Sequence, residues 1–186
     1  KPLTFFLGMS LIERVVFLLR HYGIRDFVVV VGYRGEEVKK HLSGRDLGVR
    51  IQFVENPNWE QENGLSLLSA EGAVMGEDFI LTMADHVFEV EALKPLFHPP
   101  KKVCTLLIDE NVGEVFDLKD ATKLLLENGV AKRIGKDLST YNAVDCGVFY
   151  CTSEIFTALK ACTAVGKYRL SDAVQYPVSY THLRAH

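Results

Sequence analysis

Residues 10–42 read SLIERVVFLLRHYGIRDFVVVVGYRGEEVKKHL, which is a helical pattern, an apolar run and a second helical pattern. Apolar residues recur at helical spacing over Leu11–His21, and Ser10 with Glu13 three residues on has the form of a capping box. Phe27–Val31 is continuously apolar, which is typical of a strand in a parallel sheet covered by helices on both faces. This stretch therefore predicts an α/β fold.

The alternation of helices and strands continues along the chain. Further helices are expected at Glu36–Leu42, Leu65–Val74 and Glu91–Phe97, and further strands at Val49–Val54, Phe79–Met83 and Val103–Ile108. That order predicts a doubly wound sheet. In the second half, Asn128-Gly129 between two apolar runs predicts a type I′ hairpin, followed by a strand at Ala143–Cys151 and two more helices at Ser153–Ala161 and Ser171–Tyr176.

We expect one domain over residues 1–176, Rossmann-like, with a mixed and mainly parallel sheet and helices on both faces. Residues 177–186 show no periodicity, and we interpret them as a non-native tail outside this domain.

The composition excludes several classes of protein. With 186 residues, 48% of them hydrophobic, the chain can bury the core of one domain and is unlike a disordered or disulfide-rich protein. A net charge of -3, with Lys and Arg spread along the chain, argues against nucleic acid as the main partner. The longest apolar run, Phe27–Val31, is far shorter than the ~20 residues of a membrane span. Four cysteines without a C-x-x-C pair argue against a zinc site and for a reducing cytoplasm.

Asp85 is a candidate metal ligand because it directly follows the apolar strand Phe79–Met83. In open α/β sheets, ligands bind outside the carboxyl ends of the strands. A carboxylate at that place is able to hold Mg²⁺ against phosphate oxygens. The alternative is that Asp85 only caps a turn.

Asn63-Gly64-Leu65-Ser66 is a candidate nucleotide contact, since it opens a helix after a polar loop. Glycine lets a ligand approach the backbone, and the free amides of a first helical turn suit an anion or a base edge. The alternative is that Asn63 is an ordinary N-cap.

Four charged residues complete the candidates. Asp145 lies inside an apolar strand, where a carboxylate needs a partner or a ligand. Asp172 follows Ser171 at the start of a helix and has the alternative of a plain first-turn residue. Lys1 and Lys123 have the alternative of solvated surface lysines.

Seven short segments stand in the order of a known family. They are Lys1-Pro2-Leu3-Thr4, Asn63-Gly64-Leu65-Ser66, Ala84-Asp85-His86, Phe116-Asp117-Leu118, Ala121-Thr122-Lys123, Tyr141–Phe149 and Leu170–Val174, spanning positions 1 to about 175. With them the chain resembles the sugar-nucleotide pyrophosphorylase-like nucleotidyltransferases, and among these the inositol-1-phosphate cytidylyltransferases of di-myo-inositol phosphate synthesis. The resemblance implies a Rossmann-like mixed sheet with helices on both sides.

The resemblance also implies roles for the candidate residues. Lys1 and Lys123 are implied as catalytic lysines on the nucleotide phosphate and the acceptor phosphate. Asn63, Gly64, Ser66 and Asp85 are implied to bind the nucleotide, and Asp145 with Lys123 the acceptor. Asp85 and Asp172 are implied to hold Mg²⁺, with Asp145 left open as the second metal carboxylate.

In the resembling family, a first strand and a Gly-rich loop of the form G-x-G-x-R precede the motif lysine. The sequence begins at that lysine, so we expect an N-terminally truncated domain whose first strand and Gly-rich loop are missing. The family's bifunctional members also carry a membrane-embedded phosphotransferase domain after this one, and these 186 residues contain nothing of it.

The implied reaction is transfer of CMP from CTP to a phosphorylated polyol such as inositol-1-phosphate, with release of pyrophosphate. The attacking phosphate is ionised near neutral pH, so no general base is required. A sugar-1-phosphate or choline-phosphate acceptor stays open, as do a non-catalytic nucleotide-sensing domain of the same fold and a homo-oligomer. A Rossmann oxidoreductase is disfavoured because no G-x-G-x-x-G follows any strand.

Overall fold

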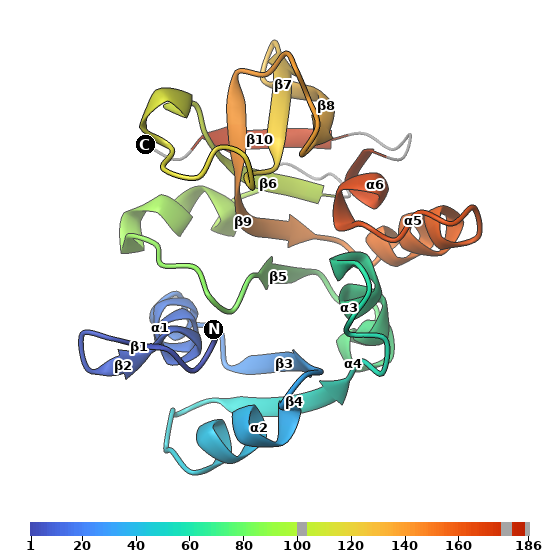
Figure 1. The fold of residues 1–186 in the computed structure, drawn as a ribbon. Helices are drawn as coiled ribbons and strands as arrows, with labels where there is room; N and C mark the ends of the chain where they lie inside the picture. Colours follow the sequence, from blue (N-terminus) through green and yellow to red (C-terminus); the bar gives the residue numbers. More distant parts are fainter. Residues whose placement is uncertain (100–103, 176–179, 185–186) are drawn as a thin grey trace.

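The structure, a computed structural model, describes residues 1–99, 104–175 and 180–184. Its first half contains β1 (Phe5–Phe6), β2 (Met9–Ser10), α1 (Leu11–His21), β3 (Asp26–Val31), α2 (Gly35–Ser43), β4 (Arg50–Glu55), α3 (Asn63–Ser69), α4 (Glu71–Val74) and β5 (Phe79–Thr82). Its second half contains the 3-10 helices η1 (Val90–Phe97) and η2 (Val112–Glu114), strands β6 (Cys104–Asp109), β7 (Lys123–Glu127), β8 (Val130–Gly135), β9 (Ala143–Cys151) and β10 (Tyr180–Arg184), and helices α5 (Glu154–Thr163) and α6 (Leu170–Gln175). Figure 1 shows these elements along the chain.

The first helix begins and ends where the sequence predicts. The Ser10 N–H donates to the Glu13 carboxylate (2.9 Å) and the Glu13 N–H donates to the Ser10 hydroxyl (3.4 Å), which completes the capping box. Gly23, at φ +91°, turns the chain after the helix toward β3. The type I′ hairpin between β7 and β8 is confirmed as well, because Asn128 and Gly129 both have positive φ.

A six-stranded sheet forms the larger half of the molecule, in the order β10-β6-β9-β7-β8 with β5 also on β9. Side chains of β6 alternate between its two faces. Cys104, Leu106 and Ile108 join the cluster under α3, α5 and α6. Leu107 joins the opposite cluster with α1 and η1. Helices on both faces of a mixed sheet are therefore confirmed.

The balance of strand directions differs from the expectation of a mainly parallel sheet. Of the pairings between described strands, β3–β4 and β10–β6 are parallel, while β9 runs antiparallel to β5, β6 and β7. The reason is the central position of β9, whose three neighbours all run in the opposite direction.

The smaller half is the parallel pair β3–β4, in register from Asp26 opposite Arg50 to Val31 opposite Glu55. It packs against α1 and α2 through a cluster around Ile12, Val16 and Leu42. Among the described residues, β3 pairs with β4 alone and β5 with β9 alone. Figure 1 shows β3 and β5 on successive levels of the molecule.

Two predicted helices differ in detail. The helix expected over Leu65–Val74 is divided at Ala70 into α3 and α4. The segment expected to be helical at Glu91–Phe97 is the 3-10 helix η1, which contains Pro95, a residue without the N–H that an α-helical hydrogen bond needs.

The last described strand, β10, comes from the stretch interpreted as a tail. Its backbone pairs in parallel with β6, from Tyr180 opposite Cys104 to Arg184 opposite Ile108. Its non-native origin stays a prediction. Of the helices in the part of the chain that the structure describes, none has the length and apolar character required to cross a bilayer.

Candidate active site

Four strand ends meet at one edge of the larger sheet. At the end of β5, Thr82 lies opposite Val148 of β9, and the Met83 N–H donates to the Gly147 carbonyl (3.2 Å). At the start of β7 and the end of β6, Lys123 and Asp109 both lie opposite Val144. The structure therefore brings the ends of these strands, with Asp85, Lys123 and Asp145, to the same edge.

A β-bulge shapes this edge. The register between β6 and β9 shifts from Leu106 opposite Phe149 to Ile108 opposite Asp145, which leaves Cys146 and Gly147 bulged out of the ladder. Bulges frequently re-aim side chains beside active sites. Gly147 has φ +74°, and a Cβ there would lie 3.0 Å from Nε2 of His86, so this position requires glycine.

Asp145 is the carboxylate that precedes the bulge. Its Oδ1 accepts the Gly147 N–H at 2.5 Å, and its own N–H donates to the Thr122 carbonyl at 2.9 Å. Burial raises the pKa of Asp145 to about 7, although the Gly147 hydrogen bond works against the rise. A carboxyl group that titrates near neutral pH is able to donate to a hydroxyl as well as accept from one.

Lys123, which lies opposite Val144 of β9, is buried, with 8% of its surface exposed. Its Nζ donates to the Lys136 carbonyl (2.7 Å) and lies 5.7 Å from the centroid of the Tyr141 ring. An ammonium group has three N–H donors, so this anchoring bond leaves others for an anionic ligand. The alternative of a solvated surface lysine does not describe Lys123.

Asp85 follows β5, and about a third (34%) of its side chain is exposed. Its Oδ1 lies 3.1 Å from Nδ1 of His86. Mg²⁺ is usually held by one or two carboxylates together with substrate phosphates. A half-exposed carboxylate at the end of a strand fits that kind of ligand. No group of three His, Cys, Asp or Glu side chains gathers as a metal site within residues 1–99, 104–175 and 180–184.

Asp172, the second metal carboxylate of the prediction, caps the start of α6. Its Oδ2 accepts the Arg169 N–H at 3.2 Å. This contact fits the alternative that Asp172 is a plain residue of the first helical turn. A metal role for Asp172 stays a prediction.

The start of α3 docks on the segment before α6. Asn63 Oδ1 accepts the Leu170 N–H (2.9 Å), and the Gly64 N–H donates to the Tyr168 carbonyl (3.0 Å). A Cβ at Gly64 would lie 2.5 Å from that carbonyl oxygen. Glycine is therefore required by contact with the chain's own backbone, and its nucleotide contact stays a prediction.

Ser66 and Lys1 lie at two other places around the site. The Ser66 hydroxyl accepts from Asn56 Nδ2 at 3.0 Å, which ties α3 to the end of β4. Lys1 is exposed, and its carbonyl accepts the Thr4 N–H at 2.8 Å in the turn before β1. Leu3 and Ala84 pack against the same hydrophobic cluster.

Sequence reasoning missed two residues of this edge. Asp109 ends the apolar strand β6, much as Asp85 comes just after β5, so a similar signal identifies it. Gly147 carried no signal of its own, because its bulge depends on β6.

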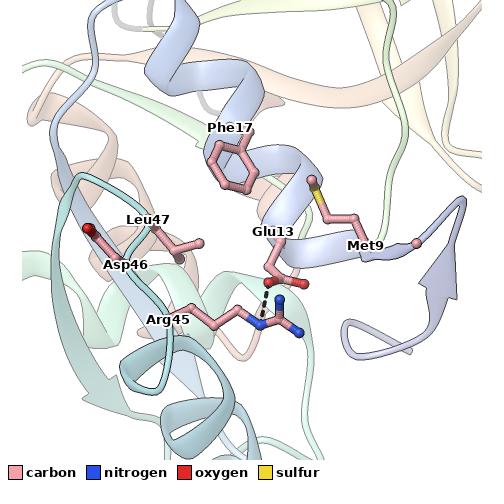
Figure 2. A pocket seen from close by; sticks show the side chains of 7 residues that line it. Met9, Glu13, Phe17, Arg45, Asp46 and Leu47 are labelled. Atoms are coloured by element: carbon pink, nitrogen blue, oxygen red, sulfur yellow. Dashed lines mark ion pairs between the residues drawn. The ribbon is translucent and has the colours of Figure 1, made fainter.

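Two surface depressions lie away from this edge. One, of about 390 Å³, lies at the first turn of α1 (Figure 2); it is lined by Gly8, Met9, Glu13, Phe17, Arg45, Asp46 and Leu47. Burial alone would raise the pKa of Glu13, but hydrogen bonds from Ser10 and His41 and the charge of Arg45 outweigh it and lower the pKa. The Glu13 carboxylate is thus satisfied within the fold. The other depression, of about 250 Å³, lies beside Trp59 at the ends of β3 and β4.

Comparison with known proteins gives the family. Residues 1–126 match the MobA-like NTP transferase domain. The chain belongs to this family. The structure of the inositol-1-phosphate CTP transferase from T. maritima is similar, with a TM-score of 0.88, 26% identity, and coverage of 99% of this chain and 76% of that chain.

Two proteins that are similar to this chain in sequence are much longer than it. The bifunctional IPC transferase and DIPP synthase of Rubrobacter xylanophilus is 37% identical over 172 residues, which cover 92% of this chain and 38% of the relative. The protein of the same name from Aquifex aeolicus is 32% identical over 157 residues, covering 84% of this chain and 35% of the relative. The chain thus spans less than two fifths of the length of these NTP transferase relatives.

Proposed function

We propose that the chain is a nucleotidyltransferase domain that transfers CMP from CTP to a phosphorylated polyol, such as inositol-1-phosphate, and releases pyrophosphate. The observation that carries the proposal is the sheet edge at which the strand ends next to Asp85, Lys123 and Asp145 meet. The family supports nucleotidyl transfer. The similar inositol-1-phosphate CTP transferase supports the choice of base and acceptor.

The reaction joins two phosphates. An ionised oxygen of the acceptor phosphate attacks the α-phosphorus of CTP and forms a new P–O bond, while the bond from that phosphorus to the bridging oxygen breaks and pyrophosphate leaves. Charge is already present on the nucleophile, so positioning and neutralisation of charge are the work of the protein.

Lys123 and Asp145 are assigned to the acceptor. The fixed ammonium group of Lys123 neutralises the acceptor phosphate, and Asp145, at the bulge of β9, exchanges hydrogen bonds with the polyol hydroxyls. Because Lys123 is already tied to the Lys136 carbonyl, it loses little side-chain freedom when the acceptor binds.

Asp85 is assigned to the nucleotide side. Mg²⁺ would be held by Asp85 together with phosphate oxygens of CTP, and it would neutralise their charge. Asn63, Gly64 and Ser66 are assigned to the base and ribose, Lys1 to the nucleotide phosphates, and Asp172 or Asp145 to a second carboxylate contact with the metal.

The open edges of β3 and β5 support an N-terminal strand that completes this domain. Both strands are apolar, and each leaves one edge without a partner among the described residues. An unpaired buried edge is costly, so a strand preceding Lys1 is proposed to pair with both, and its Gly-rich loop to hold the triphosphate. A cytoplasmic location is also proposed, in keeping with four free cysteines.

The test uses the chain extended before Lys1 by a strand and a Gly-rich loop, called the extended chain below. Pyrophosphate release is measured with Mg²⁺ for each of CTP, UTP, ATP and GTP, against inositol-1-phosphate, glucose-1-phosphate and choline phosphate. We expect kcat/KM for CTP with inositol-1-phosphate to exceed every other pair by about 10-fold or more. A higher kcat/KM with a sugar-1-phosphate would identify that sugar-1-phosphate as the acceptor in place of inositol-1-phosphate. Nucleotide binding with no turnover for any pair would favour a non-catalytic sensing domain.

A further inference from the structure

His86 contacts Asp85 on one side and the backbone of Gly147 on the other. Its Nδ1 is 3.1 Å from Oδ1 of Asp85. An ionised carboxylate only accepts hydrogen bonds, so Nδ1 is the donor in this pair. The bond limits rotation of the Asp85 side chain.

The other edge of the same ring rests on the β9 bulge. A Cβ at Gly147 would lie 3.0 Å from Nε2 and 3.2 Å from Cδ2 of His86, so the ring is in close contact with this backbone. The Gly147 N–H is the group that donates to Asp145 (2.5 Å), and the Gly147 carbonyl accepts from Met83 (3.2 Å). His86 is thus joined to Asp85 by a hydrogen bond and to Asp145 through the backbone of Gly147.

Phe88 fixes the plane of the ring. The His86 and Phe88 rings are stacked, with centroids 5.9 Å apart and planes at 19°. Contacts with Asp85, Gly147 and Phe88 from three sides leave the imidazole little freedom, although 43% of the side chain is exposed.

We propose that His86 is a positioning residue that sets the orientation of Asp85 relative to Asp145. The inference rests on the proposed function, in which Asp85 faces the nucleotide and Asp145 the acceptor. His86 touches neither substrate in this arrangement and acts through the two carboxylates. Carboxylates beside metal ions depend on groups that hydrogen-bond to them, and loss of such groups lowers metal affinity or activity by about 10–100-fold.

Two substitutions separate the two contacts of the ring. His86→Asn keeps an N–H donor close to the position of Nδ1 but removes the ring from Gly147. His86→Phe keeps a ring against Gly147 and Phe88 but removes the donor to Asp85. His21→Phe is the matched control, because His21 is at the last turn of α1 and its ring contacts Tyr22.

The measurements are the dissociation constant of Mn²⁺·CTP by electron paramagnetic resonance, which needs no turnover, and KM for inositol-1-phosphate, all in the extended chain. We expect His86→Phe to raise the Mn²⁺·CTP dissociation constant by about 10-fold or more with KM for the acceptor little changed. We expect His86→Asn to raise KM for the acceptor with Mn²⁺·CTP affinity largely retained. A merely structural histidine would lower the melting temperature without this division.

Gly147→Ala gives an independent route, and Gly129→Ala is its control. Both glycines have nearly the same φ, +74° and +73°, but a Cβ at Gly129 meets nothing within 4 Å. We expect a larger KM for the acceptor in Gly147→Ala alone. If the His86 variants match His21→Phe, and Gly147→Ala matches Gly129→Ala, the inference is overturned. If the unsubstituted chain does not bind Mn²⁺·CTP, the proposed function itself fails.

Discussion

Strands β3 and β6 have similarly apolar sequences, DFVVVV and CTLLID, but they are buried to very different extents. In β6, Cys104–Ile108 are all buried, and the exposure of each is at most 1%. In β3, Phe27–Val30 are half-buried, and Val31 alone is buried. The difference lies in their neighbours, because β6 pairs with both β9 and β10 whereas β3 pairs with β4 among the described strands.

The comparison shows that an apolar run in the sequence indicates which neighbours a strand needs in order to be buried. A strand such as β3 is typical of the centre of a sheet with both edges paired. The half-buried valines of β3 and the equally half-buried β5 are therefore consistent with the proposed strand that pairs with both. The predictions below test this difference and the site that adjoins it.

The largest expected effect is that of a strand placed before Lys1. Burying each half-exposed apolar side chain of β3 and β5 contributes up to about 1.5–3 kcal/mol, and several together are comparable with the ~5–15 kcal/mol stability of a domain. We expect the extended chain to unfold at a clearly higher denaturant concentration than the 186 residues alone. Amide hydrogen exchange should slow most in β3 and β5.

Activity, like stability, should be higher in the extended chain than in the 186 residues alone. The 186 residues alone are expected to release no measurable pyrophosphate from CTP, Mg²⁺ and inositol-1-phosphate, because the amides proposed to hold the triphosphate belong to the Gly-rich loop. An extension of equal length made of Gly and Ser is the control for added length. Equal turnover with and without the strand would contradict the proposal that it completes the domain.

The next largest effect is that of Asp85→Asn. This substitution removes the charge that is proposed to face the nucleotide while keeping the size of the side chain. We expect kcat to fall by about 100–1,000-fold, as for loss of one charge-stabilising group, with the thermal midpoint little changed because the side chain is partly exposed. Asp46→Asn, on the surface beside α1, is the control. Near-normal turnover in Asp85→Asn would end its assignment as the metal carboxylate.

Local signals in the sequence predicted the elements well and their contacts less well. The bounds of α1 follow from its cap and its terminal glycine, and the bounds of β9 from its apolar run. The bulge within β9 depends on its register with β6, about 40 residues away. The docking of Asn63 on Leu170 joins positions 107 residues apart, so no local pattern indicates it.

For the candidate site, too, local signals predicted some features, while others depend on contacts between distant segments. A strand end indicated Asp85 and an apolar strand around a carboxylate indicated Asp145, and strand pairing then placed both at the same edge of the sheet as Lys123. The burial of Lys123 could not be predicted, because it depends on the Lys136 carbonyl across the hairpin. The role of Asp172 could not be predicted either, because a residue that caps α6 and a residue that holds a metal would have the same sequence pattern at this position.

A stability measurement sharpens the comparison between the strands. Leu106→Ala in β6 leaves a cavity in a fully buried cluster and should lower the free energy of unfolding by about 2–5 kcal/mol. Val29→Ala in β3 removes fewer atoms from a half-buried position, so its cost should be well below that. In the extended chain, the cost of Val29→Ala should rise while that of Leu106→Ala stays the same. Urea unfolding of the four variants and of the two unsubstituted proteins measures both costs. Equal costs of Val29→Ala in the two backgrounds would show that β3 gains no burial from the added strand.

Asp145→Ala separates the two substrates. The carboxyl group is assigned to the polyol, so we expect KM for inositol-1-phosphate to rise by about 10-fold or more, the cost of leaving a polar contact unmade. KM for CTP should change much less. Equal increases in both constants, or a lowered melting temperature alone, would give Asp145 a structural role in holding the bulge.

The smallest expected effect is a pH dependence of stability that belongs to Asp145. Burial raises the pKa of its carboxyl group from 3.8 to about 7, so between these values the folded protein keeps a proton that the unfolded chain releases. Unfolding is favoured by a rise in pH wherever the folded state binds more protons. The Asp145 contribution is therefore favourable at low pH and is lost progressively as the pH rises toward 7. Asp145→Asn retains an oxygen to accept the Gly147 N–H but cannot ionise. We expect the stability of this variant relative to the unsubstituted protein to increase from pH 4.5 to pH 7.5, measured by urea unfolding at steps between them, a window set by that shift. If the difference in unfolding free energy between the two proteins stays constant across this range, Asp145 has the same pKa in the folded and unfolded states. The bulge then holds its carboxyl group in contact with water.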